Sequence, residues 1–182
     1  MPKFYTQTGD DGYTGLLGEG RIAKHDLRLD AVGTLDEATA VIGLARSISL
    51  APQTAPLLVE IQRDLYHIMA EVAATPENVS RFRFIDAPRV TWLEGQIDAL
   101  SDLVSLPNEF ILPGDSRSGA SMAVARTVVR RSERLIAHLI HTAQLDNREL
   151  LRYLNRLSSL CFVLELLENQ ASGQSDPTLA KI

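Results

Sequence analysis

The sequence predicts an all-α protein: a five-helix bundle with a glycine-rich loop before its first helix. Five of the eleven glycines lie within the first 20 residues, and apolar residues then recur at three- and four-residue steps. Most prolines fall between these periodic segments. A chain of 182 residues has the size of one ordinary domain. We therefore expect a single domain over 1–182, with a loop over 1–27, a helical bundle over 28–170 and a polar, mobile tail over 171–182.

The first helix is expected over residues 28–50. Its apolar residues share one side at helical spacing: Val32, Leu35, Ala38, Val41, Ile42 and Ala45. Thr34 and Glu37 could also form a capping box, in which case the helix would begin later. The second helix is expected over 55–74, where a long apolar side stops before Pro76.

The third helix is expected after a loop over residues 76–86. Asp86 would cap this helix and Pro88 would occupy its first turn, since proline is tolerated where a helix has no amide partner to lose. The pattern continues to about Leu103. The segment NEFILPGDSRSG then interrupts it with proline, glycine and polar residues.

The fourth helix is predicted from about Ser118 to His141 and the fifth from Asp146 to about Asn169. The core-facing row of the fourth helix would contain Ala125, Val129, Ser132, Ile136 and Leu139. Asp146, followed three residues later by Glu149, is typical of a helix start. Helices joined by mostly short loops form a bundle.

Composition excludes several classes of function. The single cysteine, Cys161, excludes an intrachain disulfide and any multi-cysteine metal site. A net charge of −5 argues against bulk binding of nucleic acid, which normally requires a basic face. No apolar run approaches the roughly 18 residues of a membrane span, and the first residues do not resemble a secretion signal. We expect a protein of the reducing cytoplasm.

Arginines on the predicted fourth helix form the first candidate site. Fifteen of the 18 basic residues are arginine, and arginine suits bidentate contacts with carboxylate or phosphate. Arg126, Arg130 and Arg134 are four residues apart and would lie on one side of the helix with Glu133 nearby. The spacing alone allows two interpretations: a solvated surface balanced by carboxylates, or a phosphate-binding surface.

The N-terminal loop is the second candidate site. The segment from Thr6 to Gly15 offers glycine amides and threonine hydroxyls to a phosphate, and Lys24 follows closely as a point charge. The segment lacks the spacing of a P-loop or of a Rossmann fingerprint. Cys161 lies in an apolar run typical of inert core, and paired Glu-x-x-His motifs for a di-metal bundle are absent from the sequence.

Five segments, in the same order, resemble the PduO-type ATP:corrinoid adenosyltransferases. They are Thr6–Gly15 followed by Lys24, Val32–Glu37, Phe110–Gly114, Ala125–Arg134 and Tyr153–Ser158. The resemblance implies a homotrimer with ATP at each subunit interface and the corrinoid beside it. It also implies an enzyme that transfers the 5′-deoxyadenosyl group of ATP to cobalt(I) of cobalamin or a related corrinoid, giving adenosylcobalamin and triphosphate.

The resemblance also implies roles for individual residues. Arg130, Asp36 and Arg126 would be catalytic, with Asp36 paired to Arg126 across the interface, and Phe110 would cover the lower face of the corrinoid. The residues that would bind ATP are Thr6, Gln7, Thr8, Gly9, Thr14, Gly15, Lys24, Arg130, Arg131, Ser132, Glu133, Arg134 and Asn155. Magnesium would arrive with ATP and use no dedicated protein site.

Two residues depart from the family pattern on the corrinoid side: Asp115, where many members have a small residue, and Ser159, where aspartate is common. They leave the choice between cobalamin and a biosynthetic precursor open. The implied partners are a cobalt(II) reductase and an enzyme that uses adenosylcobalamin. The alternative from another class is a nucleotide-sensing or cofactor-delivery bundle that does not turn over.

Overall fold

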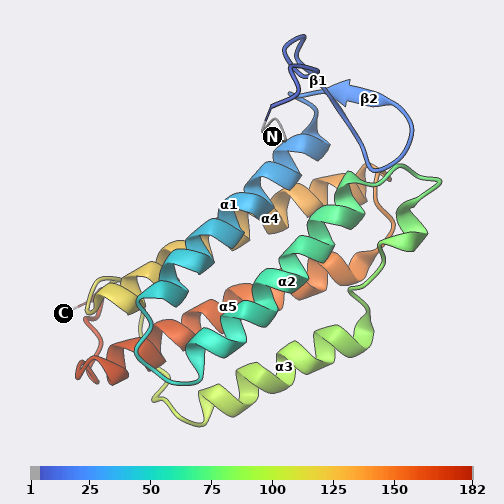
Figure 1. Cartoon of the computed structure of the whole chain (residues 1–182). Coiled ribbons are helices and arrows are strands. Elements are labelled where there is room, and N and C mark those ends of the chain that lie inside the picture. The colour runs from blue at the N-terminus through green and yellow to red at the C-terminus, as the bar shows by residue number, and fades with distance from the viewer. Residues whose placement is uncertain (1–4, 182) are drawn as a thin grey trace.

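Five helices form an elongated bundle in the computed structural model, which describes residues 5–181 (Figure 1). The first four residues of the expected loop and the last residue of the expected tail lie outside the described part. The helices are α1 (Leu27–Ser47), α2 (Thr54–Ala73), α3 (Ala87–Ser101), α4 (Arg117–His141) and α5 (Arg148–Ala171), and a 3-10 turn, η1, spans Val79–Arg81. The predicted five-helix, mostly helical architecture is confirmed.

The first helix does not start at a capping box formed by Thr34 and Glu37. Asp26 caps α1 instead, because its side chain accepts a hydrogen bond from the amide of Arg28. Thr34 lies inside the helix, where its hydroxyl donates to the carbonyl of Asp30 at 2.8 Å.

The fifth helix is capped one residue later than the sequence indicates. Asn147, rather than Asp146, accepts from the amide of Glu149 at 3.1 Å. Asp146 pairs instead with Arg83, and this contact lowers the pKa of the Asp146 carboxyl. Because the Asp146 carboxylate pairs with Arg83, it does not cap the N-terminus of α5.

The N-terminal segment contains a short antiparallel hairpin that the sequence did not indicate. Strand β1 (Tyr13–Gly15) pairs with β2 (Arg21–Ala23), so that Tyr13 lies opposite Ala23. Leu17, between the strands, makes backbone hydrogen bonds to Ala73 and Thr75 at the end of α2. We call residues 5–26 the N-terminal hairpin segment.

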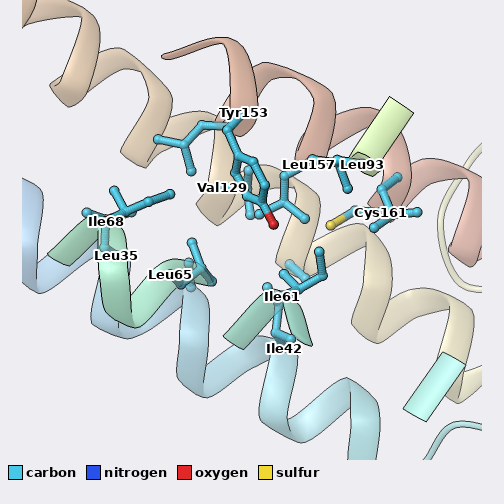
Figure 2. Packing of buried hydrophobic residues seen from close by; sticks show 14 of the residues in the cluster. Leu35, Ile42, Ile61, Leu65, Ile68, Leu93, Val129, Tyr153, Leu157 and Cys161 are labelled. Carbon is cyan, nitrogen blue, oxygen red and sulfur yellow. The ribbon is translucent and has the colours of Figure 1, made fainter. Parts of the chain in front are cut away.

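The core lies between α1, α2, α4 and α5, while α3 packs on α5 (Figure 1). Figure 2 shows buried side chains of this core, among them Leu35 of α1, Ile61 of α2, Leu93 of α3, Val129 of α4 and Tyr153 of α5. The predicted core row of α4 is fully buried: Ala125, Val129, Ser132, Ile136 and Leu139. Complete burial of a side chain such as Val129, Ile136 or Leu139 is worth about 1.5–3 kcal/mol.

A charged cluster is buried in this core between α2, α3 and α5. The hydroxyl of Tyr153 donates to Asp64 at 2.5 Å, and Nε of Arg89 donates to the same carboxylate at 2.8 Å. Asp64 is 1% exposed, so both bonds are needed to offset the cost of burying its charge. The guanidinium of Arg89 also lies 3.7 Å from the ring centroid of Trp92.

The C-terminal tail (residues 172–181) folds back onto the loop before α4. Ile111 and Leu179 form an isolated antiparallel bridge. The amide of Leu112 donates to Thr178 at 2.8 Å, and the amide of Ala180 donates to Phe110 at 2.7 Å. The tail, expected to be mobile, thus has hydrogen-bonded partners that its polar composition did not indicate.

Candidate active site

The N-terminal hairpin segment is braced by its own arginine. The guanidinium of Arg21 donates to both carboxylate oxygens of Asp11 at 2.8 Å, to the carbonyl of Tyr13 at 3.0 Å and to the carbonyl of Thr8. The hydrogen bond from Arg21 is the main reason why the pKa of Asp11 is lowered. Arg21 therefore links several points of the segment, although none of residues 5–26 is buried.

Lys24, near the end of this segment, folds back onto its glycine-rich part, the place expected of a phosphate-binding lysine. Its Nζ donates to the carbonyl of Gly9 at 2.7 Å, and a Cβ on Gly9 would come within 2.9 Å of that ammonium. A side chain at position 9 would therefore displace the Lys24 ammonium from its present place. The hydroxyls of Thr6 and Thr8 lie 2.8 Å apart, and Gln7 between them has a positive φ of 61°, an uncommon conformation for a side-chain-bearing residue.

The arginine stripe (Arg126, Arg130 and Arg134) occupies one side of α4. Among residues 5–181 none of these three guanidinium groups has a carboxylate within 4 Å, whereas neighbouring Arg131 pairs with Glu37 of α1. Unpaired arginines in a row repel one another. Among these α4 arginines, a carboxylate partner within residues 5–181 is thus seen for Arg131 alone.

Asn155 on α5 contacts Glu133, which lies among the arginines of α4. Its amide donates to Glu133 at 2.9 Å, and its carbonyl accepts from Arg156 at 2.8 Å. Ser132, also expected at the ATP site, is fully buried, and its hydroxyl donates to the carbonyl of Val128. The structure does not bring the Ser132 side chain to the surface where the arginines lie.

A cavity of about 680 Å³ joins the arginine stripe to the expected corrinoid residue. Phe110 lies at its edge with a side chain that is 86% exposed, while Arg126 and Arg130 line another part. Much of the remaining lining is apolar, and it includes Ile97, Leu106, Ile111, Phe162 and Val163. Ligand cavities that are mostly apolar with a few placed charges are typical binding sites.

Most of these apolar lining residues could not be recognised from the sequence pattern. Ile97 and Phe162 belong to helices α3 and α5, where the helical pattern interprets an apolar residue simply as core. Ser159, singled out as a departure from the family, does line the cavity, whereas Asp115 does not. Only the placement of α3 beside α5 reveals that these positions share one cavity.

Asp36 and Arg126 do not meet within one chain. Asp36 is exposed on α1, and Nε of Arg126 is buried without a hydrogen-bond partner. The N-terminal hairpin segment and the arginine stripe are likewise joined by no hydrogen bond or ion pair in the part of the chain that the structure describes. The residues expected to bind ATP thus form two separate groups.

Two buried groups lie close to Arg126. Burial raises the pKa of the Cys161 thiol to about 12, which makes this cysteine a poor nucleophile, as its apolar surroundings predict. Burial and, to a lesser extent, the charge of Asp115 raise the pKa of Glu165 to about 7, against the opposing charge of Arg126. One oxygen of Glu165 is buried without a hydrogen-bond partner.

No group of three or more histidine, cysteine, aspartate or glutamate side chains able to hold a metal occurs among residues 5–181. Within the same range, none of the helices combines the length and apolar character that crossing a bilayer demands.

The sequence from residue 4 to residue 168 matches the protein family described as cobalamin adenosyltransferase. The chain belongs to this family. It is 37% identical over 177 residues to the cobalamin adenosyltransferase of Cupriavidus metallidurans, covering 97% of this chain and 93% of the relative. It is 40% identical over 175 residues to the corrinoid adenosyltransferase of Mycobacterium tuberculosis, with coverage of 93% and 90%.

Solved structures of the family share the fold of this chain. A variant of the PduO-type ATP:corrinoid adenosyltransferase from Lactobacillus reuteri, complexed with cobalamin and ATP, superposes with a TM-score of 0.88. The two sequences are 33% identical, and the match covers 99% of this chain and 100% of the other. Another variant of that enzyme, complexed with ATP, has a TM-score of 0.89 and is 30% identical, with coverage of 98% and 100%.

Proposed function

We propose that this member of the cobalamin adenosyltransferase family transfers the 5′-deoxyadenosyl group of ATP to cobalt(I) of cobalamin or a related corrinoid. The observation that carries the proposal is the cavity that places Phe110 at one edge and Arg126 and Arg130 along its lining. An apolar space for the corrinoid is thereby continuous with cations suited to the triphosphate.

The reaction requires little acid–base chemistry from the protein. The electron pair of cobalt(I) forms a bond to C5′ of the ribose, and the bond from C5′ to oxygen breaks so that its electrons leave with triphosphate. The protein must hold cobalt, carbon and oxygen in line and neutralise the departing charge. Magnesium bound to ATP would add to that neutralisation, and we assign it no protein ligands.

Individual residues divide this work between them. Arg130 would contact the triphosphate, with Lys24 and the amides of the N-terminal hairpin segment holding the same group. Phe110, a residue that is 86% exposed and lines the cavity, would cover the lower face of the corrinoid. Keeping an axial ligand away from cobalt(II) makes its reduction to cobalt(I) easier.

We further propose a homotrimer in which ATP lies between subunits. Asp36 is exposed, and neither Asp36 nor Arg126 makes an ion pair among residues 5–181, so a second copy could supply each with the other as a partner. Exposed apolar side chains on the same helices support a covered face, since Leu44 of α1 is 59% exposed and Val124 of α4 is 52% exposed. A shared site would also unite the two groups of ATP-binding residues.

The experiment for the activity is an anaerobic assay with ATP, magnesium and cobalamin reduced to cobalt(I), followed by the visible spectrum of the adenosylated product. Product formation with equimolar triphosphate supports the proposal. Nucleotide binding without product, or triphosphate release without adenosylation, would identify the alternative sensing or delivery bundle.

The experiment for the assembly is light scattering at micromolar concentration. We expect a trimer for the native protein, smaller species for Asp36→Arg and for Arg126→Asp, and recovery of the trimer when both changes are combined. An active monomer would refute the interface. We also place the reaction in the reducing cytoplasm, supplied by a cobalt(II) reductase and feeding an enzyme that uses adenosylcobalamin.

A further inference from the structure

Asp115 connects the loop before α4, which also bears Phe110, to the C-terminal tail. One carboxylate oxygen accepts from the amide of Thr178 at 3.0 Å, and the other accepts from the hydroxyl of Thr178 at 2.6 Å. The same tail is bound through its backbone to Phe110 and Leu112. The aspartate therefore holds the tail at the point where the tail holds the loop that bears Phe110.

The base of this connection is rigid. Ser116, the residue after Asp115, caps α4 by accepting from the amide of Gly119 at 2.9 Å, and its hydroxyl donates to Asn169 of α5 at 2.6 Å. Gly114, the residue before, has a φ of +133°, a conformation that side-chain-bearing residues rarely adopt. The backbone therefore turns sharply at glycine and presents the Asp115 carboxylate to the tail.

The loop before α4 has little else to fix it. Phe110 is 86% exposed and Leu112 is 50% exposed, so neither side chain is anchored in the core. The hydrogen bonds from Ala180 to Phe110 and from Leu112 to Thr178, at 2.7 and 2.8 Å, flank the bridge between Ile111 and Leu179. Because the side chains give so little anchoring, the position of Phe110 depends on this backbone pairing.

We propose that Asp115 is a positioning residue for the corrinoid step: by latching Thr178 it holds the tail against the Phe110 loop and so sets the place of the Phe110 ring. The inference rests on the proposed adenosyltransferase function. Asp115 does not line the cavity. It acts through Thr178 and the tail, and its effect is therefore specific to the role of Phe110.

The first test measures the latch without any activity. In Asp115→Ala we expect the amides of Leu112 and Ala180 to exchange hydrogen at least tenfold faster than in the native protein, while amides in the core of α5 are unchanged. Asp115→Asn should restore protection, since an amide can accept from the Thr178 amide and donate to its hydroxyl. Unchanged exchange in Asp115→Ala would overturn the latch.

The second test measures the consequence for cobalt. Turnover from cobalt(II) with a mild reductant should fall about tenfold in Asp115→Ala, whereas turnover from cobalt(I) and the KM for ATP should change less than twofold. Thr178→Val should show a smaller fall of the same kind, and the double variant should fall no further than Asp115→Ala alone, because both changes break one contact. Asp115→Asn should again behave as the native protein, with turnover from cobalt(II) restored.

Asp176→Ala is the matched control, because Asp176 is an exposed acid of the same tail that makes no hydrogen bond among the described residues. It should behave as the native protein in both tests. Equal losses from cobalt(II) and cobalt(I), or a failure of Asp115→Asn to recover, would overturn the positioning role. Failure of the proposed function is distinguishable, since the native protein would then form no adenosylated product at all.

Discussion

Replacing Glu165 by glutamine should make the protein more stable at alkaline pH and change little at acid pH. Glu165 is 1% exposed, and burial raises its pKa from 4.5 to about 7. The folded state therefore retains a proton that the unfolded chain releases, so the free energy of unfolding falls as pH rises from about 4.5 through 7. At 1.36 kcal/mol per unit, the shift costs about 3 kcal/mol once the group has ionised.

The assay is denaturant unfolding of the native protein and of Glu165→Gln at pH 5 and pH 8. The gain from the substitution should be about 2–3 kcal/mol larger at pH 8, because most of the penalty develops between these values. Asp98→Asn, on an exposed position of α3, should show no such difference. A gain that is the same at both pH values would mean that Glu165 ionises as an ordinary carboxyl, and the reasoning from burial would be wrong.

Four further outcomes are expected. Arg130→Ala should nearly abolish turnover, since a charge-assisted contact to triphosphate is worth roughly 1.5–3 kcal/mol before any additional stabilisation of the transition state. Arg130→Lys should recover little activity because a point charge cannot form a bidentate pair. Native rates in both variants would mean that Arg130 is an ordinary solvent-exposed residue. Phe110→Ala should reduce turnover from cobalt(II) far more than turnover from cobalt(I), with an unchanged melting temperature, whereas equal losses with a lowered melt would make Phe110 a packing residue. Tyr153→Phe should lower the free energy of unfolding by about 1–3 kcal/mol, because Asp64 loses a buried hydrogen bond, and an unchanged urea midpoint would contradict this. Gly119→Ala should lower the free energy of unfolding by about 1–3 kcal/mol, because the new methyl group would collide with the side chain of Asn169. A native melting temperature would contradict this and show that the Asn169 side chain can move aside.

The helices could be predicted from the sequence because their signal is local. The row from Ala125 to Leu139 repeats at helical spacing and is buried as expected. The strands β1 and β2 were missed because each has only three residues, which is too short to show an alternation of apolar and polar side chains. The burial of Asp64 was missed because a charge on a helix is ordinarily interpreted as solvent-facing, and its partners lie 25 and 89 residues away.

The candidate site could be predicted only in part for a similar reason. The spacing of Arg126 and Arg130 places them on one side of a helix, but that spacing cannot show that an apolar cavity begins there. The contacts of the tail are backbone hydrogen bonds, which any residue can make, so residues 178–180 carry no signature of them. Asp115 drew attention only as an unusual residue, and the structure supplies its partner.

The brace formed by Arg21 and Asp11 has a consequence for how a nucleotide would be captured. A flexible glycine loop must lose conformational freedom when it closes on a ligand, and that loss weakens binding. Here the freedom is lost when the protein folds, and Lys24 already donates to a carbonyl of the same loop. A phosphate oxygen of the nucleotide would replace that carbonyl as the acceptor of the Lys24 ammonium, so no distant side chain would have to move to the site. Nucleotide binding would then replace one hydrogen-bond acceptor of Lys24 by a more strongly charged one, in a segment whose conformation is already formed.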